Sequence, residues 1–153
     1  KKTILRKYSS LIQNDLLVLD ESYLEADDIV EYLSRFHAGF CLYDLKMIDR
    51  DDFNYLSVPS GKLFYYYAAG VPVIGSDILG LKTISEYQTG ITLTDLSPEC
   101  IAAAIARVME RHETLRANCI KAARNFDFNS SVAAFKQHLT DDSSGSQEKN
   151  KHC

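Results

Sequence analysis

The stretch Val58-Pro-Ser-Gly-Lys-Leu-Phe-Tyr-Tyr-Tyr-Ala-Ala-Gly-Val-Pro-Val-Ile-Gly-Ser76 decides the fold that the sequence predicts. Ser60 is a residue type that often caps the start of a helix. Residues 62–69 are apolar on nearly every face, which is typical of a helix enclosed on several sides. Gly70 can end that helix in a left-handed conformation, and the run Val71–Ile74 is typical of a strand inside a parallel sheet. We therefore expect a loop, a short helix, a tight turn and a buried strand.

The start of this helix carries groups that suit a phosphate. Ser60 and Gly61 lead into it, and Lys62 lies in its first turn. A helix N-terminus offers free N–H groups and a positive dipole end, and the lysine adds charge. The sequence thus predicts a phosphate site at these residues. The alternative is that Ser60 only caps the helix and Lys62 is solvated.

Strand-like and helical patterns alternate along the chain. Compact apolar runs predict strands at Leu16–Leu19, Gly39–Tyr43, Val71–Gly75 and Ile91–Leu93. Strands that are joined through helices pair in parallel by right-handed crossovers. The predicted fold is therefore α/β, a Rossmann-like three-layer domain with a parallel sheet.

Helical spacing of apolar residues marks the segments between and after these strands. Ser97-Pro98 is a favourable cap and first-turn pair for one of the helices. We expect the opening helix to pack on one face of the sheet. The expected helices cover Lys1–Asn14, Glu25–Phe36, Leu81–Tyr87, Pro98–Met109, Thr114–Ala123 and a last segment that starts at Ser130.

Composition places the chain among ordinary globular domains. Its 153 residues suffice for one domain, and 46% hydrophobic and 25% charged residues are globular values. A net charge of −4 gives no reason to expect nucleic acid as a partner. The four cysteines are scattered, which predicts reduced packing residues in a cytoplasmic protein, and no apolar run reaches the ~18 residues of a membrane span. Residues 141–153 are polar, and we expect a disordered tail there.

Residues Pro59–Ile74 resemble the signature P-x-K-L-F-E-Y-x-A-A-G-x-P-V-I of retaining glycosyltransferases of the GT-B fold. The proline stands one residue further from the lysine than in that pattern. The likeness continues through Ser76-Asp77 and Gly80-Leu81 to Thr89-Gly90-Ile91. In that family the signature lies in the C-terminal domain, which binds the sugar donor.

The resemblance implies that residues 1–140 are a partial donor-binding domain, an incomplete half of a GT-B fold. The strands that open this domain in the family, and the N-terminal acceptor domain, have no counterpart here. We therefore expect the isolated chain to lack transferase activity and to self-associate through an uncovered sheet edge. The full enzyme would be cytoplasmic or peripheral to the membrane, as suits polysaccharide or glycolipid assembly.

The resemblance also implies a ligand. The donor would be a nucleotide sugar, UDP- or GDP-linked, with no further cofactor, and its diphosphate would meet Ser60, Gly61 and Lys62. Ser57, Tyr65 and Tyr66 fall where the family, or base stacking on an aromatic ring, would hold the nucleoside. The sequence assigns no catalytic residue.

Several positions depart from the family pattern. Tyr65 stands where the family has a glutamate that binds the ribose hydroxyls, Ser57 near the place of its partner glutamate, and Thr83 where the family has an acid. A tyrosine cannot accept from two hydroxyls as a carboxylate does. The alternative function is therefore a degenerate, non-catalytic binding or assembly module, and the aromatic residues 65–67 could simply be core.

The loop after the second predicted strand is acidic, with Asp49 and Asp51 spaced like the first two ligands of a calcium loop. Phe53 falls where the third ligand belongs, and Asn54 where that loop needs glycine. We therefore expect a solvated loop and no metal site.

Overall fold

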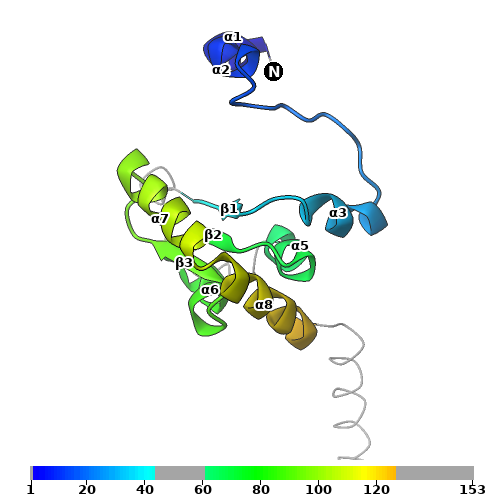
Figure 1. The fold of residues 1–153 in the computed structure, drawn as a ribbon, viewed down its shortest axis with the longest axis vertical. Helices are drawn as coiled ribbons and strands as arrows, with labels where there is room; N and C mark the ends of the chain where they lie inside the picture. The colour runs from blue at the N-terminus through cyan, green and yellow to red at the C-terminus, as the bar shows by residue number, and fades with distance from the viewer. Residues whose placement is uncertain (1, 44–60, 127–153) are drawn as a thin grey trace, which may run out of the picture.

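The computed structural model describes residues 2–43 and 61–126. Within these ranges three strands form one parallel sheet in the order β1-β2-β3: β1 (Gly39–Cys41), β2 (Val73–Ser76) and β3 (Gly90–Leu93). The central strand places Ile74 opposite Phe40 on one side and Ile91 on the other. The predicted α/β class with a parallel sheet is confirmed, and the arrangement is compatible with a Rossmann-like fold (Figure 1).

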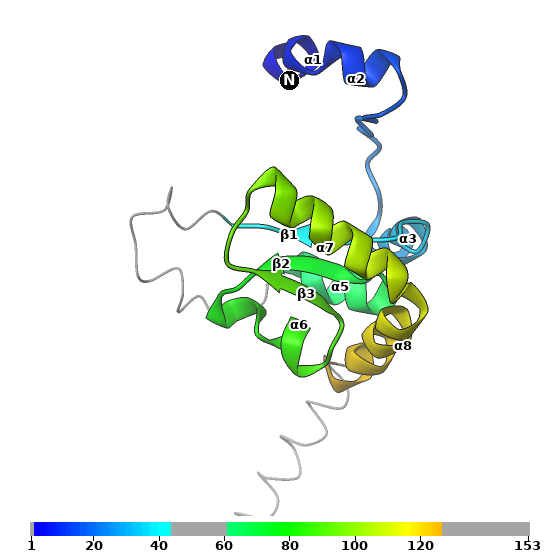
Figure 2. The same ribbon diagram turned by 60° about the vertical axis from the view of Figure 1, so that its left-hand side comes forward.

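Helices cover both faces of the sheet (Figure 2). The apolar segment 62–69 is helical as predicted, and the helix begins at Gly61. The helical elements are α1 (Lys2–Lys7), α2 (Ser9–Gln13), α3 (Ala26–Leu33), α5 (Gly61–Ala69), η2 (Leu79–Leu81), α6 (Thr83–Glu86), α7 (Pro98–Glu110), α8 (His112–Ala123) and η3 (Arg124–Phe126).

Two apolar clusters make the layers. On one face of the sheet, Leu63 and Tyr67 of α5 pack with Ile84 of α6 and with residues of β1 and β2. On the other face, Val108 of α7 packs on Ile74 of the central strand. Both faces of β2 are therefore covered, which is why its whole sequence is buried, as in parallel sheets generally.

Helix α8 closes the amino-terminal end of the sheet. The Cys119 thiol lies 3.4 Å from the carbonyl oxygens of Val71 and Thr89, the residues that lead into β2 and β3. Gly70, with φ of 67°, ends α5 in the left-handed conformation that the sequence predicts. Since α8 occupies this end, the carboxyl ends of the strands are the ones that the described helices leave uncovered.

The predicted cap of α7 and several predicted helices are also confirmed. Ser97 caps α7, because its side chain accepts from the Cys100 N–H, and Pro98 occupies the first turn. The expected helices around residues 25–36, 81–87 and 114–123 are present, with shorter or shifted bounds. Ends of helices are the part that sequence patterns place least well.

The prediction of a strand at Leu16–Leu19 is wrong. This segment starts with a bend at Leu16 and pairs with no strand, and Leu16 and Val18 are exposed to 74% and 76%. The backbone N–H groups of Leu16 and Leu17 bind the Leu11 carbonyl and so close the end of α2. An apolar run shows only a tendency to be buried, and here local bonds use the backbone groups that a sheet would need.

The expectation that the opening helix packs on the sheet is also wrong. The helical segment is broken into α1 and α2, which stand apart from the three layers (Figure 1). Leu5, Tyr8 and Leu11 on these helices are exposed. Helical spacing indicates an apolar side, but it does not say what covers that side.

Some expectations fall outside the described residues. These are the cap at Ser60, the nucleoside contact at Ser57, the acidic loop with Asp49 and Asp51, the helix from Ser130 and the tail 141–153.

Candidate functional site

The start of α5 lies beside the carboxyl ends of the first two strands. Gly61 opens the helix, and Lys62 follows in its first turn with its side chain exposed. The Lys62 ammonium lies 5.4 Å from the centre of the Tyr43 ring, just past the end of β1. In open α/β sheets ligands bind at this end of the strands, so the two described residues of the predicted phosphate site occupy a suitable place.

A side chain from β2 fixes the chain where it leaves β1. The Ser76 hydroxyl accepts from the Tyr43 N–H at 2.7 Å and donates to the Tyr43 carbonyl at 3.0 Å. Ser76 is 3% exposed, so these bonds are shielded from water. They hold Tyr43, and with it the position of the ring next to Lys62. Sequence reasoning missed this pair, because 33 residues separate its members.

The three consecutive tyrosines of α5 point in different directions. Tyr65 is 37% exposed on the outer side, one turn after Lys62. Tyr66 turns toward the sheet and lies against Gly39, where a Cβ atom would be 2.6 Å from the ring. Tyr67 is fully buried, and its hydroxyl accepts from Thr89 at 2.9 Å. Of the three, Tyr67 is a core residue and Tyr65 is the one most open to a ligand.

Burial raises the pKa of both inner tyrosines. For Tyr66, hydrogen bonding with the Phe40 backbone partly offsets the rise in pKa. For Tyr67, bonds with Thr83 and Thr89 do the same. Both phenols are therefore neutral structural groups rather than bases.

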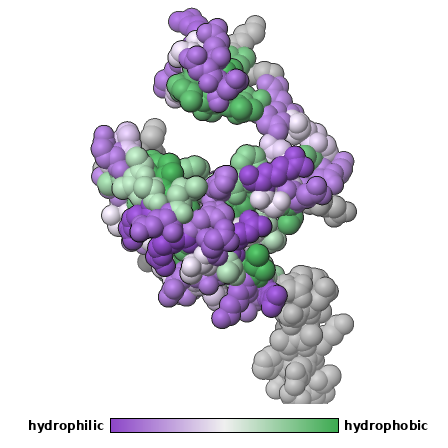
Figure 3. Space-filling view, in the orientation of Figure 1, coloured by the Kyte–Doolittle hydropathy of each residue, from purple (hydrophilic) through white to green (hydrophobic). Residues whose placement is uncertain are grey.

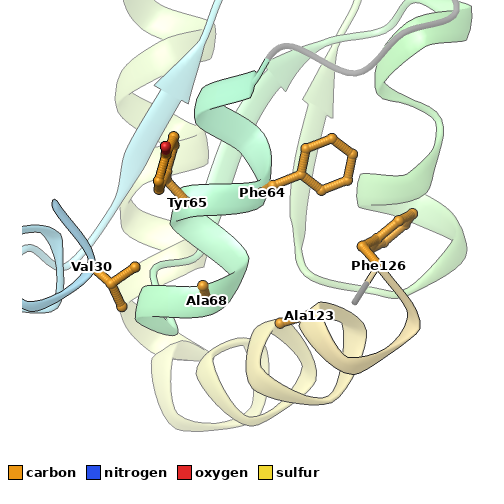
Figure 4. A pocket seen from close by; sticks show the side chains of 6 residues that line it. All are labelled: Val30, Phe64, Tyr65, Ala68, Ala123 and Phe126. Atoms are coloured by element: carbon orange, nitrogen blue, oxygen red, sulfur yellow. The ribbon is translucent and has the colours of Figure 1, made fainter. Parts of the chain in front are cut away.

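An apolar groove of about 240 Å³ runs along the outer side of α5. Tyr65 borders it, with α3 on one side and the end of α8 on the other (Figure 4). The ring of Phe126 meets that of Phe64 at 4.9 Å between centres and closes one end. The lining residues are Val30, Phe64, Tyr65, Ala68, Ala123 and Phe126. The helix is thus open on this side, although its apolar sequence predicts enclosure on several sides.

Two residues of α6 bear on the carboxylate that the resemblance implies. Thr83, at the position of the family acid, directs its hydroxyl to within 3.3 Å of the Tyr67 hydroxyl, inside the core. Glu86 is exposed and forms an ion pair with Lys82 at 3.3 Å. Neither supplies a carboxylate next to Tyr65.

The cysteines are unpaired within the described residues, as their scattered placement predicts. Burial raises the pKa of the Cys41 thiol to about 11 and that of the Cys119 thiol to about 12. Both are protonated at neutral pH and unsuited to nucleophilic chemistry. In residues 2–43 and 61–126, moreover, no cluster of three His, Cys, Asp or Glu side chains has the geometry to hold a metal ion.

The same ranges contain no helix with the length and hydropathy of a membrane span. Comparisons with models of known protein families, with curated proteins and with solved structures find no match for this chain. What the site does is therefore argued from its residues.

Proposed function

We propose that this chain is the donor-binding part of a GT-B-type retaining glycosyltransferase, which transfers a sugar from a UDP- or GDP-sugar to a polysaccharide or glycolipid acceptor. The observation that carries the proposal is the place of Lys62. The resemblance of Pro59–Ile74 to the family signature assigns this lysine and the helix start to the donor diphosphate, and α5 starts beside the carboxyl ends of β1 and β2.

The helix start and Lys62 would act on the reaction through electrostatic stabilisation. Transfer of the sugar breaks its bond to the diphosphate, and negative charge develops on the leaving oxygen. Backbone N–H groups at the start of α5 and the Lys62 ammonium would stabilise that charge without having to reorganise. The adjacent Tyr43 ring, held by Ser76, limits where the ammonium can lie. The chain by itself would bind the donor without turning it over.

Calorimetric titration of UDP and GDP against the chain tests this proposal. Lys62→Ala should weaken binding about ten- to a hundredfold, since a hydrogen bond to a charged group contributes about 1.5–3 kcal/mol. Lys7→Ala is the matched control, because Lys7 is an exposed lysine on α1, remote from α5. Equal affinity in the wild type and both variants, or no binding of either nucleotide to the wild type, would refute the phosphate assignment.

A non-catalytic binding module is the second candidate, and the groove favours it. Where a donor enzyme of this family places a carboxylate, Tyr65 borders a groove lined by apolar side chains. Such a surface suits an apolar or aromatic group better than ribose hydroxyls. Binding of a nucleoside diphosphate sugar no tighter than that of inorganic pyrophosphate would favour this module over the enzyme.

A further inference from the structure

The outer edge of β1 is open within the described residues. β1 pairs with β2 alone, and the Gly39 N–H donates to the Pro72 carbonyl on that side. Because backbone groups alternate along a strand, Phe40 directs its N–H to the opposite side. No described strand pairs with that side, and the Phe40 side chain is itself exposed. An unpaired edge of this kind is a template for a further strand.

The arrangement of the helices leaves room for a further parallel strand outside β1. Helix α5, which precedes β2, and helix α6, which precedes β3, pack on the same face of the sheet. Helix α3, which precedes β1, lies beside α5 on this same face (Figure 1). A strand outside β1 would therefore lie over α3 and continue the order of the sheet.

The N-terminal arm, residues 2–20, contains exposed apolar residues that could form such a strand. Leu16, Val18 and Leu19 are exposed, and residues 17–20 belong to no helix or strand. Apolar side chains also gather on one side of the α1–α2 unit, which stands clear of the domain (Figure 3). Exposed apolar surface that is concentrated in one segment is typical of an interaction site.

A cluster of hydrogen bonds holds the arm away from its own sheet. The Asp20 carboxylate accepts from the backbone N–H of Ser22 at 2.9 Å and from the hydroxyls of Ser22 and Tyr32. Tyr32 lies in the last turn of α3, the end that leads to the start of β1. A parallel strand at residues 16–19 of the same chain would instead bring Asp20 to the far end of β1. The arm is thus directed outward while these bonds persist.

We propose that two copies of this chain exchange their arms, so that residues 16–19 of each copy add a strand to the outer edge of β1 in the other. In the exchange the N–H groups of Leu16 and Leu17 leave the Leu11 carbonyl, and the added strand pairs with the Phe40 backbone instead. Its apolar side chains cover α3. Each copy contributes one arm and one edge, so the two contacts are identical and the assembly closes as a dimer.

Sedimentation velocity of the 153-residue chain over a range of concentrations tests the exchange. The wild type should form a dimer, and the double variant Leu16→Lys, Val18→Lys should shift to a monomer. Tyr23→Lys is the matched control, because Tyr23 is 86% exposed but lies outside the added strand, and it should remain a dimer. All three positions are exposed in one copy, so circular dichroism should show that every variant is folded, and the monomeric variant should melt at a lower temperature than the dimers.

Disulfide trapping identifies the partner strand. In a Cys100→Ser, Cys153→Ser background, chains with Leu17→Cys or Val18→Cys are mixed with chains that carry Phe40→Cys. Adjacent strand residues point to opposite faces, so one of the two arm positions should cross-link to position 40 of the other copy. A chain that carries both introduced cysteines serves as a check on the direction of the cross-link. Three results would each overturn the exchange: a monomer at all concentrations, a dimer that survives the arm substitutions, or a cross-link that forms only within one such chain.

Discussion

The Ser76 hydroxyl binds both backbone polar groups of Tyr43, accepting at 2.7 Å and donating at 3.0 Å. This contact joins the carboxyl ends of β1 and β2 at the place where the candidate phosphate site begins. Ser76→Ala should lower the free energy of unfolding by about 1–3 kcal/mol, because it removes two hydrogen bonds to partly buried backbone groups. Urea denaturation measures the change. Ser85→Ala, an exposed serine in α6, is the control and should change stability by less than about 0.5 kcal/mol. Equal effects of the two substitutions would contradict a structural role for the Ser76 contact.

The close approach of Tyr66 to Gly39 gives a second prediction. A Cβ atom at position 39 would lie 2.6 Å from the ring, and neither the strand nor the helix can yield easily. Gly39→Ala should therefore destabilise the domain by about 1–3 kcal/mol. In a Tyr66→Leu background, Gly39→Ala should lower the free energy of unfolding clearly less than in the wild type. A double-mutant cycle, with each free energy measured by denaturation, gives the coupling between positions 39 and 66. Additive costs would mean that the ring does not limit position 39.

Tyr65 tests the nucleoside assignment. It lies on the exposed side of α5, one turn beyond Lys62. If this turn holds a ribose, Tyr65→Glu should strengthen UDP or GDP binding, because a carboxylate bonds hydroxyls more strongly than a phenol does. Tyr65→Phe should change affinity little. Calorimetric titration of both variants, with thermal unfolding as a check on the fold, decides the point. An unchanged affinity for Tyr65→Glu would remove Tyr65 from the nucleoside site.

Asp20 gives a prediction on pH. Bonds from the Ser22 hydroxyl, the Tyr32 hydroxyl and the Ser22 N–H lower its pKa from 3.8 to about 2. A lowered pKa means that the ionised carboxylate stabilises the folded arrangement. This contribution is complete above pH 3.8 and is lost as the pH falls from 3.8 to about 2.

Carboxyl-carbon NMR titration measures this pKa directly. Tyr32→Phe removes one donor and should raise the midpoint toward 3.8, whereas Tyr23→Phe, at an exposed tyrosine nearby, should leave it unchanged. A wild-type midpoint near 3.8 would mean that the three bonds do not persist in solution, and that the arm is free to turn.

The candidate site was predictable where its signals are local. The helix start at Gly61 and Lys62 follows from the preceding breakers and the apolar run, and the structure places it at the expected edge of the sheet. The neighbours of that helix start were not predictable. These neighbours, Tyr43, Ser76 and the groove residue Val30, come from separate parts of the chain. Sequence patterns describe local structure and do not show which distant segments are in contact.

The sequence by itself determined the elements that short-range physics controls. Gly70 ends α5 because glycine tolerates positive φ, Ser97 caps α7, and the run before Ser76 is a buried parallel strand. Tertiary structure alone decided which apolar surfaces found partners. The run Leu16–Leu19 is as apolar as a core strand, yet it stays exposed, because Asp20 bonds to Ser22 and Tyr32 and the edge of β1 remains open. Hydrophobicity acts without direction, so it marks a segment for burial, whereas the choice of partner depends on contacts between residues far apart in the chain.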